Sequence, residues 1–441
     1  MYANTTGTEN VAVGKSALAA NTTADANTAI GFNTLAANTT GHSNVAIGKD
    51  ALDSNTTANH NIAIGVDALQ ANTTGATSVA IGGQALTANT TGGNNVAVGY
   101  QALDANTTAS SNTGIGYQAL SANTTGANSV AVGYQTLDAN TTADGNTGIG
   151  YQALSANITG ANNVAVGYQS LDANTTANAN TAVGYSSLSA NTTGTRNTAL
   201  GYHAGLAADA SDNTVIGYAA GEALTTGASN IIIGSKSGQS LTVGNNNIVM
   251  GLEALDADTK GDRNIAIGSQ ALSAQNFTTS TDSYNIAIGH SAMTSNTTGA
   301  QNTAVGGLSL DANTTGSYNT SLGYLSLSGN TTGQQNTGIG REALLTNTTG
   351  NYNVAVGQGA LALNTTASNN TAVGYDSLKA NTTGASNIAI GYQALDANTT
   401  GTWHTAVGFN ALGAITTGNN GTAFGYNALA ATTVGDNTAI G

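Results

Sequence analysis

The chain has 441 residues, with 58 Gly, no Pro, no Cys and a net charge of −14 from 8 basic and 22 acidic residues. The scarcity of Lys and Arg disfavours nucleic-acid binding, which needs clustered basic side chains against phosphates. A content of 40% apolar and 7% charged residues argues against disorder. The lack of cysteine excludes disulfides and Cys-based zinc or redox sites.

One 17-residue unit, with the consensus NVAVGYQALDANTTGAN, recurs along the whole chain. The glycine that closes NVAVG recurs from Gly14 to Gly441, which gives 26 copies, and 22 of the 25 intervals between them match the 17-residue period. The exceptions are two 16-residue intervals, at Gly201–Gly217 and Gly425–Gly441, and one 21-residue interval, at Gly268–Gly289. A fixed period of this length is typical of proteins whose repeats stack on their neighbours.

Repeat regularity divides the chain into three segments of one solenoid. Residues 1–201 and 290–441 hold regular 17-residue repeats. Residues 202–289 hold variant coils that lose the Asn-Thr-Thr segment and gain a four-residue insertion. Because insertions in a solenoid emerge as loops on one face, we expect a local bulge there.

Positions in the unit are counted here from the Asn of NVAVG. Positions two and four are apolar or Thr and position three is nearly always Ala or Gly, as in Val45, Ala46 and Ile47. This alternation predicts a strand, and we expect positions two and four to face the core. A second short strand is expected around the Leu of position nine. It ends at the Asn-Thr-Thr segment, where Asn and Gly favour a turn with positive φ.

These elements predict an all-β fold, a single-stack parallel β-solenoid (β-roll) of 26 coils with a 17-residue repeat. Coils stacked at the spacing of about 4.8 Å between strands would extend for roughly 125 Å. From about Val96 to Thr181, Asp and Ser alternate at position ten, giving a 34-residue superperiod. This alternation indicates either duplication of two-coil cassettes or an arrangement that keeps the Asp carboxylates in every second coil and so reduces their repulsion.

The Asn-Thr-Thr segment supplies the N-x-[ST] acceptor pattern for N-glycosylation. Two interpretations stay open: a glycan on each surface turn of a secreted protein, or an asparagine ladder whose side-chain amides bond from coil to coil. The candidate acceptors are Asn4, Asn21, Asn38, Asn55, Asn72, Asn89, Asn106, Asn123, Asn140, Asn157, Asn174, Asn191, Asn276, Asn296, Asn313, Asn330, Asn347, Asn364, Asn381 and Asn398.

Tyrosine recurs at position six and predicts an aromatic ladder along one edge of the coils. Such a ladder could stabilise the stack, form a chain–chain interface or bind a ligand. In eight successive coils it comprises Tyr100, Tyr117, Tyr134, Tyr151, Tyr168, Tyr185, Tyr202 and Tyr218, and position six is again Tyr at Tyr324, Tyr375, Tyr392 and Tyr426.

No pattern of catalytic or metal-ligating residues is present. The five histidines (His42, His60, His203, His290 and His404) occupy different places in the unit, without an HExxH spacing. The chain has no G-x-S-x-G, P-loop lysine or cysteine nucleophile. Asp at position ten suits weak cation contacts or a solvated face. We therefore expect no enzyme activity, no cofactor and no metal site.

The segments NVAVGYQAL and NTAIGFNTL resemble the head repeats of YadA-like trimeric autotransporter adhesins, which form parallel β-rolls in homotrimers. The unit NTGIGYQALSANTTG is also similar to repeats of bacterial and phage tail-fibre-like proteins. The resemblance extends over all 26 coils, although the 17-residue unit is longer than the usual head repeat. It implies an extracellular or cell-surface adhesin that associates with itself, as a homotrimer or an end-to-end filament.

The sequence thus predicts a non-enzymatic extracellular structural fibre or adhesin rod for surface display or attachment. The alternative is an ice- or glycan-binding solenoid that uses Thr or Tyr ladders on one face. Expected partners are further copies of the chain and glycans or a host or cell surface, without nucleic acid. No apolar run approaches the length of a membrane span, and no signal peptide is visible. We expect a mature segment of a longer protein, or a subunit whose ends meet other subunits.

Overall fold

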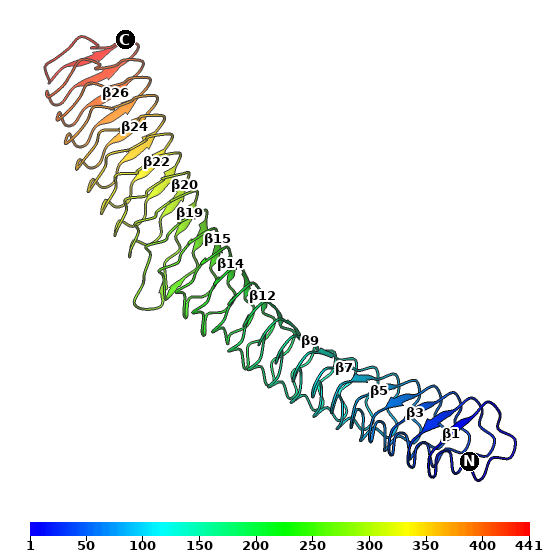
Figure 1. Cartoon of the computed structure of the whole chain (residues 1–441). Helices are drawn as coiled ribbons and strands as arrows, with labels where there is room; N and C mark the ends of the chain where they lie inside the picture. Colours follow the sequence, from blue (N-terminus) through cyan, green and yellow to red (C-terminus); the bar gives the residue numbers. More distant parts are fainter. The chain divides into compact units, whose positions relative to one another are not determined.

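The computed structural model describes all 441 residues and divides into two compact units, Met1–Asn213 and Thr214–Gly441. Each unit is an all-β parallel solenoid without helices, whose coils each contribute one three-residue strand to a sheet (Figure 1). The predicted fold class is confirmed. The division between the units lies inside the variant segment 202–289, where the repeat pattern changes.

The first unit contains twelve strands, one in each coil. They are β1 (Val11–Val13), β2 (Thr28–Ile30), β3 (Val45–Ile47), β4 (Ile62–Ile64), β5 (Val79–Ile81), β6 (Val96–Val98), β7 (Thr113–Ile115), β8 (Val130–Val132), β9 (Thr147–Ile149), β10 (Val164–Val166), β11 (Thr181–Val183) and β12 (Thr198–Leu200).

The second unit has the same arrangement with two extra two-residue strands, β16 and β18. Its strands are β13 (Thr214–Ile216), β14 (Ile231–Ile233), β15 (Ile248–Met250), β16 (Gly261–Asp262), β17 (Ile265–Ile267), β18 (Thr281–Asp282), β19 (Ile286–Ile288), β20 (Thr303–Val305), β21 (Thr320–Leu322), β22 (Thr337–Ile339), β23 (Val354–Val356), β24 (Thr371–Val373), β25 (Ile388–Ile390), β26 (Thr405–Val407), β27 (Thr422–Phe424) and β28 (Thr438–Ile440).

Strands pair in parallel with their equivalents one repeat along. In β6 and β7, for example, Val96 pairs with Thr113 and Ala97 with Gly114. The rest of the coil is hydrogen-bonded in the same way, since the amide of Leu103 donates to the carbonyl of Ala119 at 3.0 Å. Main-chain bonds therefore join neighbouring coils around the circumference, and not only along the sheet.

The expected orientation of the strand is wrong. Position three is buried in β2 to β27, whereas positions two and four are partly or fully exposed. The reason is the Leu of position nine, which crosses the interior: a Cβ added to Gly114 would lie 3.2 Å from the Cγ of Leu103. Only a small side chain at position three fits against this leucine, so the larger residues of the strand face outward.

The expected second strand is also absent. The segment around position nine forms consecutive turns, in which Gln101 and Leu103 have φ of 55° and 54°. Positive φ recurs at positions five, seven, nine and seventeen and not at the Asn-Thr-Thr segment, where it was expected. Position five is always glycine because, as at Gly116 with φ +134°, a Cβ would collide with the carbonyl of Gly133 in the next coil.

In the variant coils, a smaller residue at position nine accompanies a larger residue at position three. Where position nine is Gly205, Gly221 or Gly238, position three of the next coil is Val215, Ile232 or Val249, and all three of these larger side chains are buried. A Cβ added to Gly221 would lie 3.1 Å from the Cδ1 of Ile232. The interior of these coils thus holds a fixed volume that two positions share, as close packing requires.

We expect Ala165→Ile, at position three of β10, to lower the free energy of unfolding of the first unit by about 1–3 kcal/mol, because it overpacks the interior beside Leu154 and Leu171. Hydrogen exchange at β9 to β11 measures the local effect. Val166→Ile is the matched control, since it adds a methylene on the outer face. A larger loss of protection in the control would contradict the observed orientation.

Candidate interaction surface

The asparagines of position twelve form a buried ladder. The Nδ2 of Asn106 donates to the Oδ1 of Asn89 at 2.9 Å and to the carbonyl of Ala109 at 3.1 Å. The next coil repeats this pattern, with Asn123 donating to Asn106 at 3.0 Å. Both amide protons are engaged inside the coil, so the side chain joins one coil to the next and closes its own turn.

This ladder does not fit glycosylation at most candidate acceptors. A glycan needs an accessible Nδ2, whereas 18 of these asparagines have fully buried side chains. Asn4 and Asn276 are the exposed members of the predicted set. The buried members are Asn21, Asn38, Asn55, Asn72, Asn89, Asn106, Asn123, Asn140, Asn157, Asn174, Asn191, Asn296, Asn313, Asn330, Asn347, Asn364, Asn381 and Asn398.

A second asparagine ladder runs through position one. The Oδ1 of Asn95 accepts the backbone amide of Asn112 at 2.9 Å, and the Nδ2 of Asn112 donates to the carbonyl of Gly126 at 2.7 Å. The recurrence of Asn just before most strands is the signal that could have predicted this ladder.

His404 takes the place of asparagine in this second ladder. Its Nε2 lies 2.6 Å from the carbonyl of Gly418, and its Nδ1 accepts the amide of Gly421 at 3.0 Å. These two bonds require the neutral ring with the proton on Nε2. Burial lowers the pKa of His404 below its ordinary value of 6.5. This histidine is therefore part of the core and not a ligand-binding group.

The predicted aromatic ladder of position six is formed by stacked rings. From Tyr100 to Tyr202 successive centroids lie 4.9 to 5.9 Å apart, with interplanar angles of 5° to 18°. A second run joins Tyr375, Tyr392, Phe409 and Tyr426 with centroids 5.1 to 5.2 Å apart. Inside both runs each ring face covers the next, so the ladder presents ring edges to solvent.

Two further predicted tyrosines and the neighbouring glutamines complete this flank. Tyr218 belongs to the second unit, and Tyr324 lies between Gly307 and Arg341 at position six; both side chains are exposed. Beside the tyrosine ladder of the first unit, Gln101, Gln118 and their equivalents at position seven donate from Nε2 to the Oε1 of the preceding coil, at 3.0 Å for this pair.

The threonines of the Asn-Thr-Thr segment form two unlike rows. The position-thirteen hydroxyls are mostly engaged, as when Thr107 donates to the carbonyl of Thr124 at 3.1 Å. The position-fourteen side chains, such as Thr108, are exposed. Half of the expected hydroxyl array is therefore used for holding the coils together.

Aspartates of position ten are partly buried beside the coil backbone. Burial raises the pKa of the carboxyls of Asp104, Asp138 and Asp172. One oxygen of Asp138 and one of Asp172 has no hydrogen-bond partner. No group of three His, Cys, Asp or Glu side chains converges in a way that could hold a metal ion.

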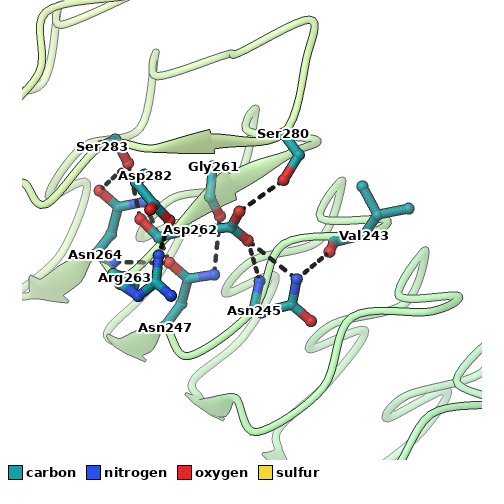
Figure 2. Close-up of polar contacts among 10 residues, drawn as sticks. All are labelled: Val243, Asn245, Asn247, Gly261, Asp262, Arg263, Asn264, Ser280, Asp282 and Ser283. Atoms are coloured by element: carbon teal, nitrogen blue, oxygen red, sulfur yellow. Dashed lines mark hydrogen bonds and ion pairs between the residues drawn. The ribbon is translucent and has the colours of Figure 1, made fainter.

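The insertion builds a polar cluster in the second unit (Figure 2). It adds β18, which pairs in parallel with β16. Asp262 accepts hydrogen bonds from the amide of Asn245 at 2.6 Å and from the Oγ of Ser280 at 2.7 Å. Arg263 forms an ion pair with Asp282, and its guanidinium lies 5.6 Å from the ring centroid of Tyr284.

A hollow of about 360 Å³ adjoins this cluster, lined by Ala228, Ser229, Asn245, Asn246, Asp262, Arg263 and Asp282. Its charged groups are already paired with one another or with backbone amides. The cluster therefore anchors the inserted loop against the two preceding coils.

The outer face of the sheet is the most extensive surface feature of each unit. Positions two and four point outward in every coil and hold only Val, Ile, Leu, Met, Phe or Thr. Exposed members include Ile115, Ile149 and Leu200 in the first unit and Ile288 and Ile390 in the second. An extended uncharged apolar surface of this kind is a candidate interaction site. The strand alternation pointed to it, but with the two faces assigned the wrong way round.

No family model and no curated protein matches the chain. The structure also contains no helix long and apolar enough to cross a membrane.

We expect acidification to weaken the region around His404. Because the folded-state pKa is lowered, the neutral ring stabilises the fold above about pH 6.5, and that stability is lost as the pH falls below it. Hydrogen exchange of β25 to β27 at pH 8 and pH 5 measures the loss. His404→Asn restores the residue that other coils hold there and should remove this contribution. An unchanged pH dependence in the variant would contradict the assignment.

Proposed function

We propose that the chain is a non-enzymatic structural segment of an extracellular or cell-surface fibre that serves display or attachment. The observation that carries this proposal is the outer sheet face, where each coil repeats the same two apolar or Thr positions without a charged residue. The buried asparagine ladders support it, because their side-chain amides join one coil to the next and are not available to other molecules. The chemistry available to other molecules therefore lies on the repeated outer rows.

The apolar rows suit association with further copies of the chain, as a homotrimer or an end-to-end filament. Exposed contiguous apolar surface is unfavourable in water, and each square ångström removed from water contributes about 25 cal/mol. Since the rows run along each unit, a second copy can cover many coils at once. The engaged hydroxyls of position thirteen make an ice-binding role the weaker alternative.

We expect the purified chain to form an assembly in sedimentation, and Ile115→Lys with Ile149→Lys to shift it to the monomer. Both isoleucines are exposed at position four, so the lysines place charge on the apolar rows without entering the core. The matched control is Thr108→Lys with Thr142→Lys, which adds the same charge at the exposed position fourteen and should leave the assembly intact. A wild-type chain that is monomeric at every concentration would refute self-association.

The location is tested on intact producing cells. A surface fibre is cleaved by an added protease while cytoplasmic markers stay intact. If the chain is cleaved only after lysis, the proposed extracellular role is wrong.

A further inference from the structure

A row of aromatic side chains crosses the second unit beside the outer sheet face. Position seventeen precedes the buried asparagine of position one and points outward, as positions two and four do. It holds Tyr284, Tyr318 and Tyr352 in every second coil, with Gln301 and Gln335 in the coils between them. The side chains of Tyr318 and Tyr352 are 53% and 57% exposed. The 34-residue superperiod thus reappears here as a surface pattern.

These tyrosines occupy a backbone conformation that disfavours them. Tyr318 and Tyr352 have φ of 62° and 58°. Bulky side chains rarely adopt this left-handed region, whereas Asn and Gly do so readily. Other coils hold Asn128, Asn369 or Gly145 at the same position with φ of 58°, 63° and 69°. Positive φ at position seventeen recurs in the other coils, for example at Ser111 and Ala179, so the conformation belongs to the repeat and the fold does not need an aromatic residue there.

The rings of this row do not stack on one another, in contrast to those of the position-six ladder. The rings of Tyr318 and Tyr352 stack on no other aromatic ring, while Tyr284 lies beside the guanidinium of Arg263. Two coils at the inter-strand spacing place neighbouring rings about 9.6 Å apart. The intervening Gln301 and Gln335 are exposed, and their side-chain amides bond to no other group in the chain.

Beyond the Arg263–Asp282 ion pair beside Tyr284, the surroundings of the row are uncharged. From Tyr284 to Asn420, positions seventeen, two and four contain no Asp, Glu, Lys or Arg. A ligand for this surface is therefore neutral, with apolar faces for the rings and hydroxyls or amides for the glutamines. Pyranose rings have this chemistry, because their C–H faces pack on aromatic rings while their hydroxyls exchange hydrogen bonds with amides.

We propose that Tyr284, Tyr318 and Tyr352 bind an extended, uncharged, β-linked polysaccharide, with Gln301 and Gln335 as hydrogen-bonding residues between them. In such a polymer every second sugar presents the same face, so one ligand chain meets successive tyrosines in register with alternate coils. The proposal rests on the attachment role proposed above and names its ligand. Trp403 lies three coils beyond Tyr352, outside this register.

The test uses the full chain with cellohexaose and chitohexaose as β-linked probes and maltohexaose as the α-linked control, measured by isothermal titration calorimetry. Binding of at least one β-linked probe without binding of maltohexaose is expected. Tyr318→Asn with Tyr352→Asn should weaken binding at least tenfold. It should also keep or raise the melting temperature, because Asn suits the left-handed backbone, so that loss of binding is not loss of fold.

The matched control is Tyr324→Asn, which removes an exposed tyrosine from position six of the coil that follows Tyr318. It should leave the affinity unchanged. The proposal is wrong if neither β-linked probe binds, if the double variant keeps its affinity, or if the control loses as much. It is also wrong if the double variant dissociates the assembly, because the row would then be a self-interface. None of these outcomes contradicts the proposed fibre role. That role is tested separately by the protease experiment on intact cells.

Discussion

Hydrogen bonding from each coil to the next, around the circumference, is the interaction on which the rest of the structure depends. A 17-residue coil encloses too little space for an ordinary hydrophobic core. The two asparagine ladders replace part of that core with buried amides whose donors are engaged, as at Asn106 and Asn112. Buried amides stabilise a fold only when they are paired, so the ladders require a strict register along each stack.

The small interior volume of each coil also determines which strand residues lie on the outer face. Leucine at position nine fills the space available, which leaves room for Ala or Gly at position three. The β-branched residues that favour strands are therefore placed outside, on a face open to solvent. Ordinary parallel sheets hide such residues. Here their exposure in coil after coil is the observation on which the proposed role in association and attachment rests.

The aromatic residues of positions six and seventeen are arranged in different ways. At position six, rings in both units cover one another and stabilise the edge through stacking. At position seventeen of the second unit, the tyrosines stand two coils apart and do not stack on one another, at a backbone angle that favours asparagine. Adjacent tyrosine rings thus stabilise the stack, and the proposed ligand recognition is assigned to the tyrosines that alternate with glutamine.

The sequence by itself determined the period, the parallel stacking, the absence of helices and the tyrosine ladder, because each follows from repetition at a fixed interval. It could not assign the inward face, because alternation of Val45, Ala46 and Ile47 defines two faces without ranking them. Only the tertiary structure decided that question, through the volume that leucine takes from across the coil. It also buried 18 candidate acceptor asparagines, since their amides complete turns that exist only once coils are stacked.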